Sequence, residues 1–245
     1  MAGFVNARVM ADAHDAGQYL YASWRKQPTQ TTGAGVWFDL SMSPGNPAPN
    51  YYIGSPGVFV PMRQSTDGGL RHGGNVSPAK KFVRKLMAMT VTAAAVPLPM
   101  LLCDYLGFYG FIDESVTDEQ PLDNTQAITR YTDGAGVHLM PVVVAGHTGG
   151  QPFTVSYTNQ NGVAGRTTGT IATGVAPTIG RMLQLPLQAG DSGVQKIESV
   201  VSSVATVGTF NVHVMRRLWT GRCRVANDGD AHDMREIGDI RHELL

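Results

Sequence analysis

The stretch from Gly35 to Pro61, GVWFDLSMSPGNPAPNYYIGSPGVFVP, decides how this chain can fold. Each of its prolines removes a backbone donor and clashes with a preceding helical turn, which excludes a helix; they are Pro44, Pro47, Pro49, Pro56 and Pro61. Its many aromatic and large aliphatic residues favour burial over disorder. We therefore expect an extended Pro/Gly-rich ribbon that lies along an apolar surface, either of its own domain or of a neighbouring subunit.

The aromatic residues of this ribbon are the candidates for contacts between subunits: Trp37, Phe38, Tyr51, Tyr52 and Phe59. One short extended segment cannot bury that much apolar surface against itself, and exposed apolar patches usually mark interfaces. We therefore expect a homo-oligomer, or a chain that binds a repeated lattice of partner subunits.

Composition favours a β-protein whose surface is partly covered by partners. Charged residues make up 16% of the 245 residues, and glycines number 29; a typical globular domain is about 25% charged. The formal net charge is zero, so no overall field attracts nucleic acid or an anionic membrane. The two cysteines, Cys103 and Cys223, are expected to be reduced thiols.

From about residue 90 onward, apolar and β-branched segments alternate with turn residues. The expected strands include Leu101–Phe111, Val137–Ala145, Phe153–Tyr157, Gly165–Ile171, Ile197–Val204 and Phe210–Val214. Between two of them, Asn161-Gly162 predicts a hairpin with a type I′ turn. Several short strands separated by turn residues indicate a mainly β fold, a β-sandwich or jelly roll.

One or two short helices are expected outside this region. Residues 7–26 have apolar residues one turn apart, with Gly17 weakening the helix and Pro28 ending it. A second helix is predicted after Ser77-Pro78, a cap followed by a proline. The expected division is an N-terminal helix and arm (1–34), the ribbon with a short helix (35–89), a β-sandwich (90–219) and a mixed-charge tail (220–245), which is either a short helix or a mobile arm.

A membrane span is weighed for Leu86–Cys103, which carries no charged residue and is about long enough. Pro97 and Pro99 in one half and Thr90 and Thr92 in the other argue against it. We expect no membrane contact.

The motif Gly190-Asp191-Ser192-Gly193 resembles the segment around the nucleophile of trypsin-like serine proteases, where a histidine activates the serine. Val194 stands where a further glycine is expected, and no Ala-Ala-His-Cys-like segment precedes the motif. We therefore interpret it as a turn between strands. A hydrolase or carbohydrate-binding module on a particle surface remains the alternative from another functional class.

The remaining polar groups do not have the spacing of a known site. The histidines show neither an i, i+4 pair nor an HxH pair. The acidic run from Asp113 to Asp123 lacks the spacing of a calcium loop, and we expect a solvated or inter-subunit loop. We therefore predict no catalytic, cofactor-binding or metal-binding residue.

The densest basic cluster consists of Lys80, Lys81, Arg84 and Lys85. It could contact DNA phosphates if this face lines a compartment that holds DNA. A solvated face is the favoured interpretation, because stacking aromatics other than Phe82 are missing.

Several segments are similar to a family of virion structural proteins that tailed bacteriophages encode, usually among head and tail genes. They are WFDLSMSPGNPAPNYYIGSP (37–56), STDGGLRHGGNVSPAKKFVRKL (65–86), LLCDYLGFYGFID (101–113), TDEQPLDN (117–124), RYTDGAGVHLM (130–140), FTVSYTNQNGVAGR (153–166) and LQAGDSGVQKIESV (187–200). The resemblance covers roughly residues 23–215. It implies a non-enzymatic virion subunit, assembled in the host cytoplasm, whose partners are major capsid or tail and neck subunits. We favour a head-associated position, as a minor capsid, vertex or decoration protein, over a tail or neck component.

Overall fold

The computed structural model describes residues 6–27, 37–63, 68–73, 81–82, 85–91, 96–146, 148, 152–173, 179–233 and 243–244. The chain forms two compact units, each assembled from segments that are distant in sequence. Unit 1 contains residues 1–24, 70–102 and 218–245, and unit 2 contains residues 25–69 and 103–217. The four consecutive segments expected from the sequence therefore do not coincide with these units, and the boundary between the units falls within two long strands, β7 (Leu98–Asp113) and β15 (Thr209–Cys223).

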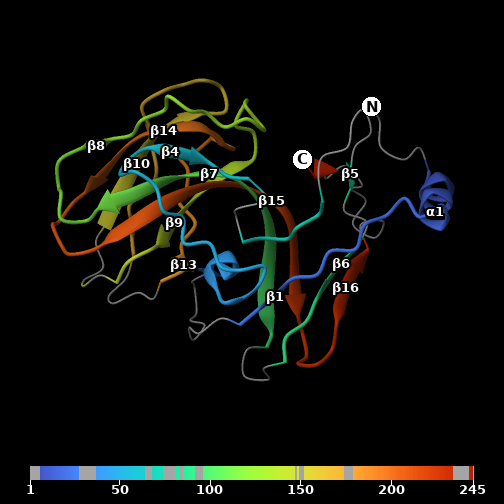
Figure 1. Ribbon diagram of the computed structural model, residues 1–245. Coiled ribbons are helices and arrows are strands. Elements are labelled where there is room, and N and C mark those ends of the chain that lie inside the picture. The colour runs from blue at the N-terminus through green and yellow to red at the C-terminus, as the bar shows by residue number, and fades with distance from the viewer. Residues whose placement is uncertain are drawn as a thin grey trace. The chain divides into compact units, whose positions relative to one another are not determined.

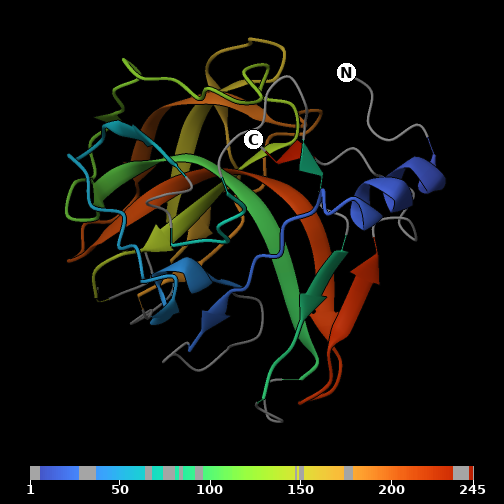
Figure 2. The same ribbon diagram turned by 45° about the vertical axis from the view of Figure 1, so that its right-hand side comes forward.

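The chain is mainly β, as predicted, and its strand ladders are antiparallel (Figure 1). Within the described residues, the larger sheet has six strands in the order β2-β13-β9-β15-β7-β4. Besides β7 and β15, these are β2 (Trp37–Phe38), β13 (Arg181–Met182), β9 (Val137–Val143) and β4 (Phe59–Pro61). In both ribbon views β7 and β15 lie side by side (Figures 1 and 2).

The smaller sheet of unit 2 has five strands among the described residues, in the order β11-β10-β14-β8, with β12 also paired to β10. They are β8 (Gln120–Pro121), β10 (Pro152–Asn159), β11 (Arg166–Thr167), β12 (Ile171–Ala172) and β14 (Val194–Ser202). A further pair joins β1 (Arg25–Lys26) to β3 (Gly45–Asn46). The strands expected around residues 101–111, 137–145, 153–157, 197–204 and 210–214 are thus confirmed, whereas the segment after residue 165 forms two short strands.

The main hydrophobic core takes side chains from the six-stranded sheet and from the five-stranded sheet. Val137 and Leu139 on β9 alternate with residues of the opposite face, as the pleat of a strand requires. Phe153 of β10 in the smaller sheet and Phe210 of β15 in the larger sheet have ring centroids 4.6 Å apart. The two sheets therefore share one core.

The other face of the larger sheet is also buried, and the ribbon covers it. Met140 and Val142 of β9 and Met215 of β15 belong to a second apolar cluster. The ribbon contributes Met42 and Tyr52 to the same cluster. The ribbon contains one 3-10 turn, η1 (Leu40–Met42), and no α-helix in its described part, as its prolines predict. The sequence left open whether the ribbon packs on its own domain or on a neighbouring subunit. In the structure it packs on its own domain.

Unit 1 has short elements. Its described residues contain helix α1 (Ala7–Asp15), and two two-stranded sheets that pair β6 (Lys85–Ala88) with β16 (Asp230–Asp233) and β5 (Lys81–Phe82) with β17 (Glu243–Leu244). Its buried side chains include Met10 on α1 and Trp219 and Cys223 on β15. Both cysteines of the chain are free thiols, as expected.

Two helix predictions require correction. The N-terminal helix forms, but it ends at Asp15 rather than near residue 26, because Gly17 takes a φ of 72° that a helix cannot continue through. The second helix, expected after Ser77-Pro78, is wrong for its described residues, which form β5 and β6. Exposure alternates along β6, which is the period of a strand, and the C-terminal segment supplies its partner.

Three other expectations also change. The predicted type I′ turn is wrong, because Gly162 alone has a positive φ, 75°, while Asn161 does not. The tail is not a helix over its described residues, since it pairs as β16 and β17. No helix among the described residues is both long and apolar enough to span a membrane.

Candidate functional site

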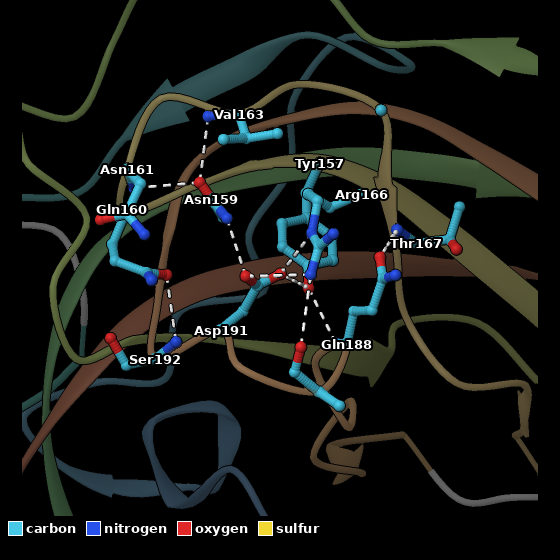
Figure 3. A network of polar contacts seen from close by, with 12 residues as sticks. Tyr157, Asn159, Gln160, Asn161, Val163, Arg166, Thr167, Gln188, Asp191 and Ser192 are labelled. Atoms are coloured by element: carbon cyan, nitrogen blue, oxygen red, sulfur yellow. Dashed lines mark hydrogen bonds and ion pairs between the residues drawn. The ribbon is translucent and has the colours of Figure 1, made fainter.

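The Gly190–Gly193 motif forms a turn, as predicted, and the turn presents Asp191 to a network of polar side chains (Figure 3). The backbone N–H of Asp191 donates to the carbonyl of Gln188, and Gly190 has a φ of 89°. The Asp191 side chain is 3% exposed. A buried carboxylate must find hydrogen-bond donors, and three side chains supply them here.

Both carboxylate oxygens of Asp191 are occupied. Tyr157 donates its hydroxyl to Oδ2 over 2.7 Å, and Asn159 donates Nδ2 to Oδ1 over 2.7 Å. Arg166 donates Nε to Oδ2 over 2.9 Å and a second N–H to Oδ1 over 3.3 Å. The Tyr157 hydroxyl in turn accepts the backbone N–H of Gln188 over 2.8 Å. Tyr157 and Asn159 lie on β10 and Arg166 on β11, so one carboxylate ties this hairpin to the 188–193 turn.

The electrostatics of the network follow from these contacts. The Arg166 guanidinium, together with the Tyr157 and Asn159 donors, lowers the pKa of Asp191 to about 2. Burial and the neighbouring carboxylate raise the pKa of Tyr157 to about 12. Asp191 therefore carries a negative charge at neutral pH, and it holds the β10–β11 hairpin to the 188–193 turn.

Protease chemistry would need a histidine hydrogen-bonded to the Ser192 hydroxyl and oriented by a buried aspartate. Asp191 instead binds the tyrosine, asparagine and arginine of the hairpin. Ser192 joins the network through its backbone N–H, which donates to Oε1 of Gln160 over 3.0 Å. This arrangement holds two loops together and does not resemble an activated nucleophile.

A second polar cluster lies in unit 2, on the ribbon-covered face of the larger sheet. The Asp39 carboxylate accepts the backbone N–H of Ser41 over 2.9 Å and also the Ser41 hydroxyl, which is hydrogen-bonded to the Tyr52 hydroxyl. Oδ2 of Asp39 lies 3.8 Å from Nδ1 of His213. The imidazole packs edge-on against the Tyr52 ring, with centroids 4.4 Å apart, and near Tyr105 at 5.6 Å.

This cluster contains serine, histidine and aspartate, yet it is not a catalytic triad. The serine contacts the aspartate rather than the histidine, and Asp39, Tyr52 and His213 are 3%, 1% and 1% exposed, so a substrate has no access. Burial raises the pKa of Asp39 and lowers the pKa of His213 to about 3. The cluster therefore holds the ribbon on the sheet, with His213 uncharged at neutral pH.

Sequence reasoning did not find either polar cluster, because its residues come from separate segments. One local signal was present: Asp39 precedes Ser41 by two residues, the spacing at which an aspartate accepts a backbone N–H in a tight turn. Nothing in the spacing of Tyr157, Arg166 and Asp191 indicates that they meet.

The five predicted contact residues of the ribbon separate into two groups. Tyr52 and Phe59 are each 1% exposed and pack in the core of their own chain, which removes them from the candidate contacts between subunits. Trp37 and Phe38 are half-buried in β2. Tyr51 is 53% exposed and stays a candidate.

The largest share of exposed apolar side chains among the described residues lies in unit 1. The chain after α1 exposes Tyr19, Leu20 and Tyr21, with Tyr21 at 81%. Strand β6 and the residues after it expose Met87, Met89 and Val91. Val9 of α1 and Val225 add to this set. We call these eight residues the unit 1 apolar surface.

The acidic and basic runs occupy different environments. Glu114 is fully buried, accepts a hydrogen bond from Thr173 over 3.2 Å and has a pKa raised by burial, so it is not part of a solvated loop. Of the basic cluster, Lys80 and Arg84 lie outside the described residues. Lys81 and Lys85 lie on β5 and β6, which pair with the acidic C-terminal segment.

A cavity of about 230 Å³ lies in unit 2, between β14 and the 124–132 loop; Tyr109, Asn124, Ile128, Lys196 and Val214 contribute to its wall. Polar groups of its wall are hydrogen-bonded to other protein groups. The Tyr109 hydroxyl donates to Asn124, and Nδ2 of Asn124 donates to the carbonyls of Leu122 and Ile197. It is smaller than the usual ligand pocket of about 300–1,000 Å³. Across the described part of the chain, no group of three or more His, Cys, Asp or Glu side chains could hold a metal ion.

Comparisons of the chain with protein-family models, with curated proteins and with solved structures found no match.

Proposed function

We propose that this chain is a non-enzymatic structural subunit of a tailed-phage virion and that it assembles through unit 1. The observation that carries this proposal is the unit 1 apolar surface. Exposed tyrosine, leucine, methionine and valine side chains on short elements are what an interface presents before its partner binds. The assignment to a virion rests on the resemblance of the quoted segments to virion structural proteins. Within the virion, we favour a position in the head.

Unit 2 is proposed to be a β-sandwich that serves as the rigid body of the subunit. The shared core of its two sheets, with the Phe153 and Phe210 rings 4.6 Å apart, supports this architecture. The Asp191 network of unit 2 supports a structural role, because its donors and acceptors engage one another. A rigid sandwich that holds an interaction unit suits a subunit that binds neighbours rather than transforms a substrate.

The copy number of this chain in purified particles, measured by quantitative mass spectrometry, tests the proposal. Multiples of five or about sixty copies would support a shell or vertex position, and about six or twelve would indicate the tail or neck. Absence from purified particles would overturn the virion proposal. Light scattering of the isolated chain then tests assembly separately.

A further inference from the structure

Two exposed methionines lie on one strand face of unit 1. Met87 and Met89 are 62% and 58% exposed, and both belong to the unit 1 apolar surface. Leu86 is half-buried and Ala88 is buried, so exposure alternates along β6 and the residues after it. The two methionines therefore share the exposed face of this segment with Val91.

The other methionines that the structure describes are shielded from solvent. Those that are no more than 6% exposed are Met10, Met42, Met62, Met140, Met182 and Met215. Met100 is half-buried, and its Sδ accepts a hydrogen bond from Sγ of Cys223 over 3.5 Å. Met1 and Met234 lie outside the described residues. Among the described methionines, an oxidant dissolved in water therefore meets Met87 and Met89 first.

The backbone next to Met87 leaves its sulfur uncovered. The turn at residues 227–229 is fixed beside β6, because the backbone N–H of Asn227 donates to the carbonyl of Thr90 over 2.8 Å. A Cβ atom on Gly229 would lie 3.0 Å from Sδ of Met87. A side chain at this position would thus cover the sulfur, and glycine does not.

The two thiols of the chain do not compete for an oxidant. Cys223 is 0% exposed. Cys103 is half-buried, and burial raises its pKa to about 12. Because the thiolate is the reactive form of cysteine, these thiols react slowly at neutral pH. A methionine thioether has no proton to lose, so its reaction with an oxidant needs no ionisation.

We propose that Met87 and Met89 form an oxidation site that controls assembly, because hydrogen peroxide converts both thioethers to sulfoxides and the oxidised chain no longer associates through unit 1. The sulfur attacks one peroxide oxygen, an S–O bond forms and the O–O bond breaks. The other oxygen leaves as water, so the sulfur is oxidised by two electrons and the peroxide is reduced. Oxidation precedes assembly, since the interface covers both sulfurs once it forms.

The change in polarity explains the effect on assembly. Methionine suits a binding surface because its flexible, apolar side chain adapts to a partner. A sulfoxide is polar, and an interface that buries it without a hydrogen-bond donor loses affinity. This inference rests on the proposed assembly through unit 1.

The test treats the purified full-length chain with limiting hydrogen peroxide until mass spectrometry detects two added oxygen atoms. Peptide mapping locates the oxidised residues, and light scattering measures association before and after treatment. The variant M87L/M89L keeps the surface apolar at similar volume but cannot form sulfoxides there. The matched control M87L/M89L/V204M/V207M places two methionines at positions of unit 2 that are 52% and 71% exposed.

We expect peptide mapping to find the first two oxygens on Met87 and Met89. The dissociation constant of the oxidised wild type should rise at least about tenfold, because two sulfoxides lose their contact with water on association. Methionine sulfoxide reductases for both sulfoxide epimers should restore association. The variant and the matched control should stay assembled after the same treatment. Urea unfolding of the oxidised wild type should match that of the untreated chain, since both side chains are exposed.

Three results would overturn the inference: oxidation that begins at other residues, unchanged association of the wild type oxidised at both sites, or equal peroxide sensitivity of M87L/M89L. An oligomer that survives oxidation leaves the proposed assembly through unit 1 intact. An untreated chain that stays monomeric instead contradicts that assembly, and the regulation with it. If M87L/M89L does not fold, the reductases decide with the wild type: restored association supports the inference, and a persistent loss overturns it.

Discussion

Unit 1 and unit 2 differ in where their apolar side chains lie. Among the described residues, unit 1 buries Met10, Ala88, Leu218, Trp219 and Cys223 and exposes the eight residues of its apolar surface. Unit 2 buries two large clusters and exposes Tyr51, Ile53, Val163, Ile179, Val201, Val204 and Val207. The ratio of buried to exposed apolar residues is therefore reversed between the units.

Element length explains much of this difference. The strands within unit 2 include β9, β10 and β14, with seven, eight and nine residues, and they form sheets that share a core. Unit 1 has strands of two and four residues outside β7 and β15. Short two-stranded sheets cannot bury much apolar area, whereas the longer strands of unit 2 bury a core of their own.

The largest expected effect tests whether unit 2 is self-sufficient. Tyr52→Ala should lower the free energy of unfolding by about 3–5 kcal/mol, because it empties a buried site and removes the hydroxyl that bonds Ser41. Tyr51→Ala, one residue away and 53% exposed, should change it by less than about 0.5 kcal/mol. Urea unfolding of the isolated chain measures both. Equal effects would mean that the ribbon does not pack on its own sheet in solution.

A smaller effect is expected from the His213 cluster in acid. The folded protein holds the pKa of His213 at about 3, below its usual 6.5, so the unfolded chain takes up the proton first. Stability from this group is fully present above pH 6.5 and falls with decreasing pH, by about 1.4 kcal/mol per pH unit and about 2 kcal/mol between pH 6.5 and 5.

The control for this prediction is His213→Gln. The quantity to compare between this variant and the wild type is the slope of the free energy of unfolding against pH. Among the groups that face the imidazole, Asp39 acts in the opposite direction, because its raised pKa makes its contribution decline as pH rises. Burial raises the pKa of Tyr105 well above its usual value, so Tyr105 stays protonated in this range. Identical slopes for the two proteins would contradict the assignment of a neutral, buried His213.

The Asn161-Gly162 turn gives a still smaller effect. Gly162 has a φ of 75°, and no atom lies within 4 Å of the position that a Cβ would take there, so only backbone strain opposes a side chain. Gly162→Val should cost about 1–2 kcal/mol, and Gly162→Asn much less, since asparagine tolerates this conformation. Asn161→Ala should cost less than about 0.5 kcal/mol. Denaturant unfolding measures the free-energy cost of all three substitutions. A large cost for Asn161→Ala would indicate that Asn161 also has a positive φ, as in the type I′ turn that the structure contradicts.

The sequence predicted unit 2 better than unit 1, and for a physical reason. The strands of unit 2 are long enough for alternation and β-branched residues to be visible, and prolines restrict the ribbon regardless of its partners. In unit 1, the structure of a segment depends on which distant segment it pairs with. The tetrapeptide Asp-Ala-His-Asp is the end of helix α1 at Asp12–Asp15 and the whole of strand β16 at Asp230–Asp233.

The polar clusters show the same limit. The turn at Gly190–Gly193 was predictable from its glycines, but its function as a clamp depends on Arg166 and Tyr157, which arrive through the pairing of β10 and β11. Likewise, Tyr52 and Tyr51 are identical neighbours in sequence. Only the fold, with Tyr52 at a φ of 51°, determines which of them is buried.

The last prediction has the smallest effect on stability and tests the interface itself. Leu20→Ser/Tyr21→Ser should change the free energy of unfolding by less than about 0.5 kcal/mol, because both side chains are more than 60% exposed. The same variant should lose the oligomer in light scattering, since these residues lie on the surface that we assign to the interface. Val204→Ser/Val207→Ser, at 52% and 71% exposure in unit 2, is the matched control and should assemble normally. If the control loses the oligomer while the unit 1 variant keeps it, the interface belongs to the β14–β15 turn of unit 2, and the contrast between the units has another cause.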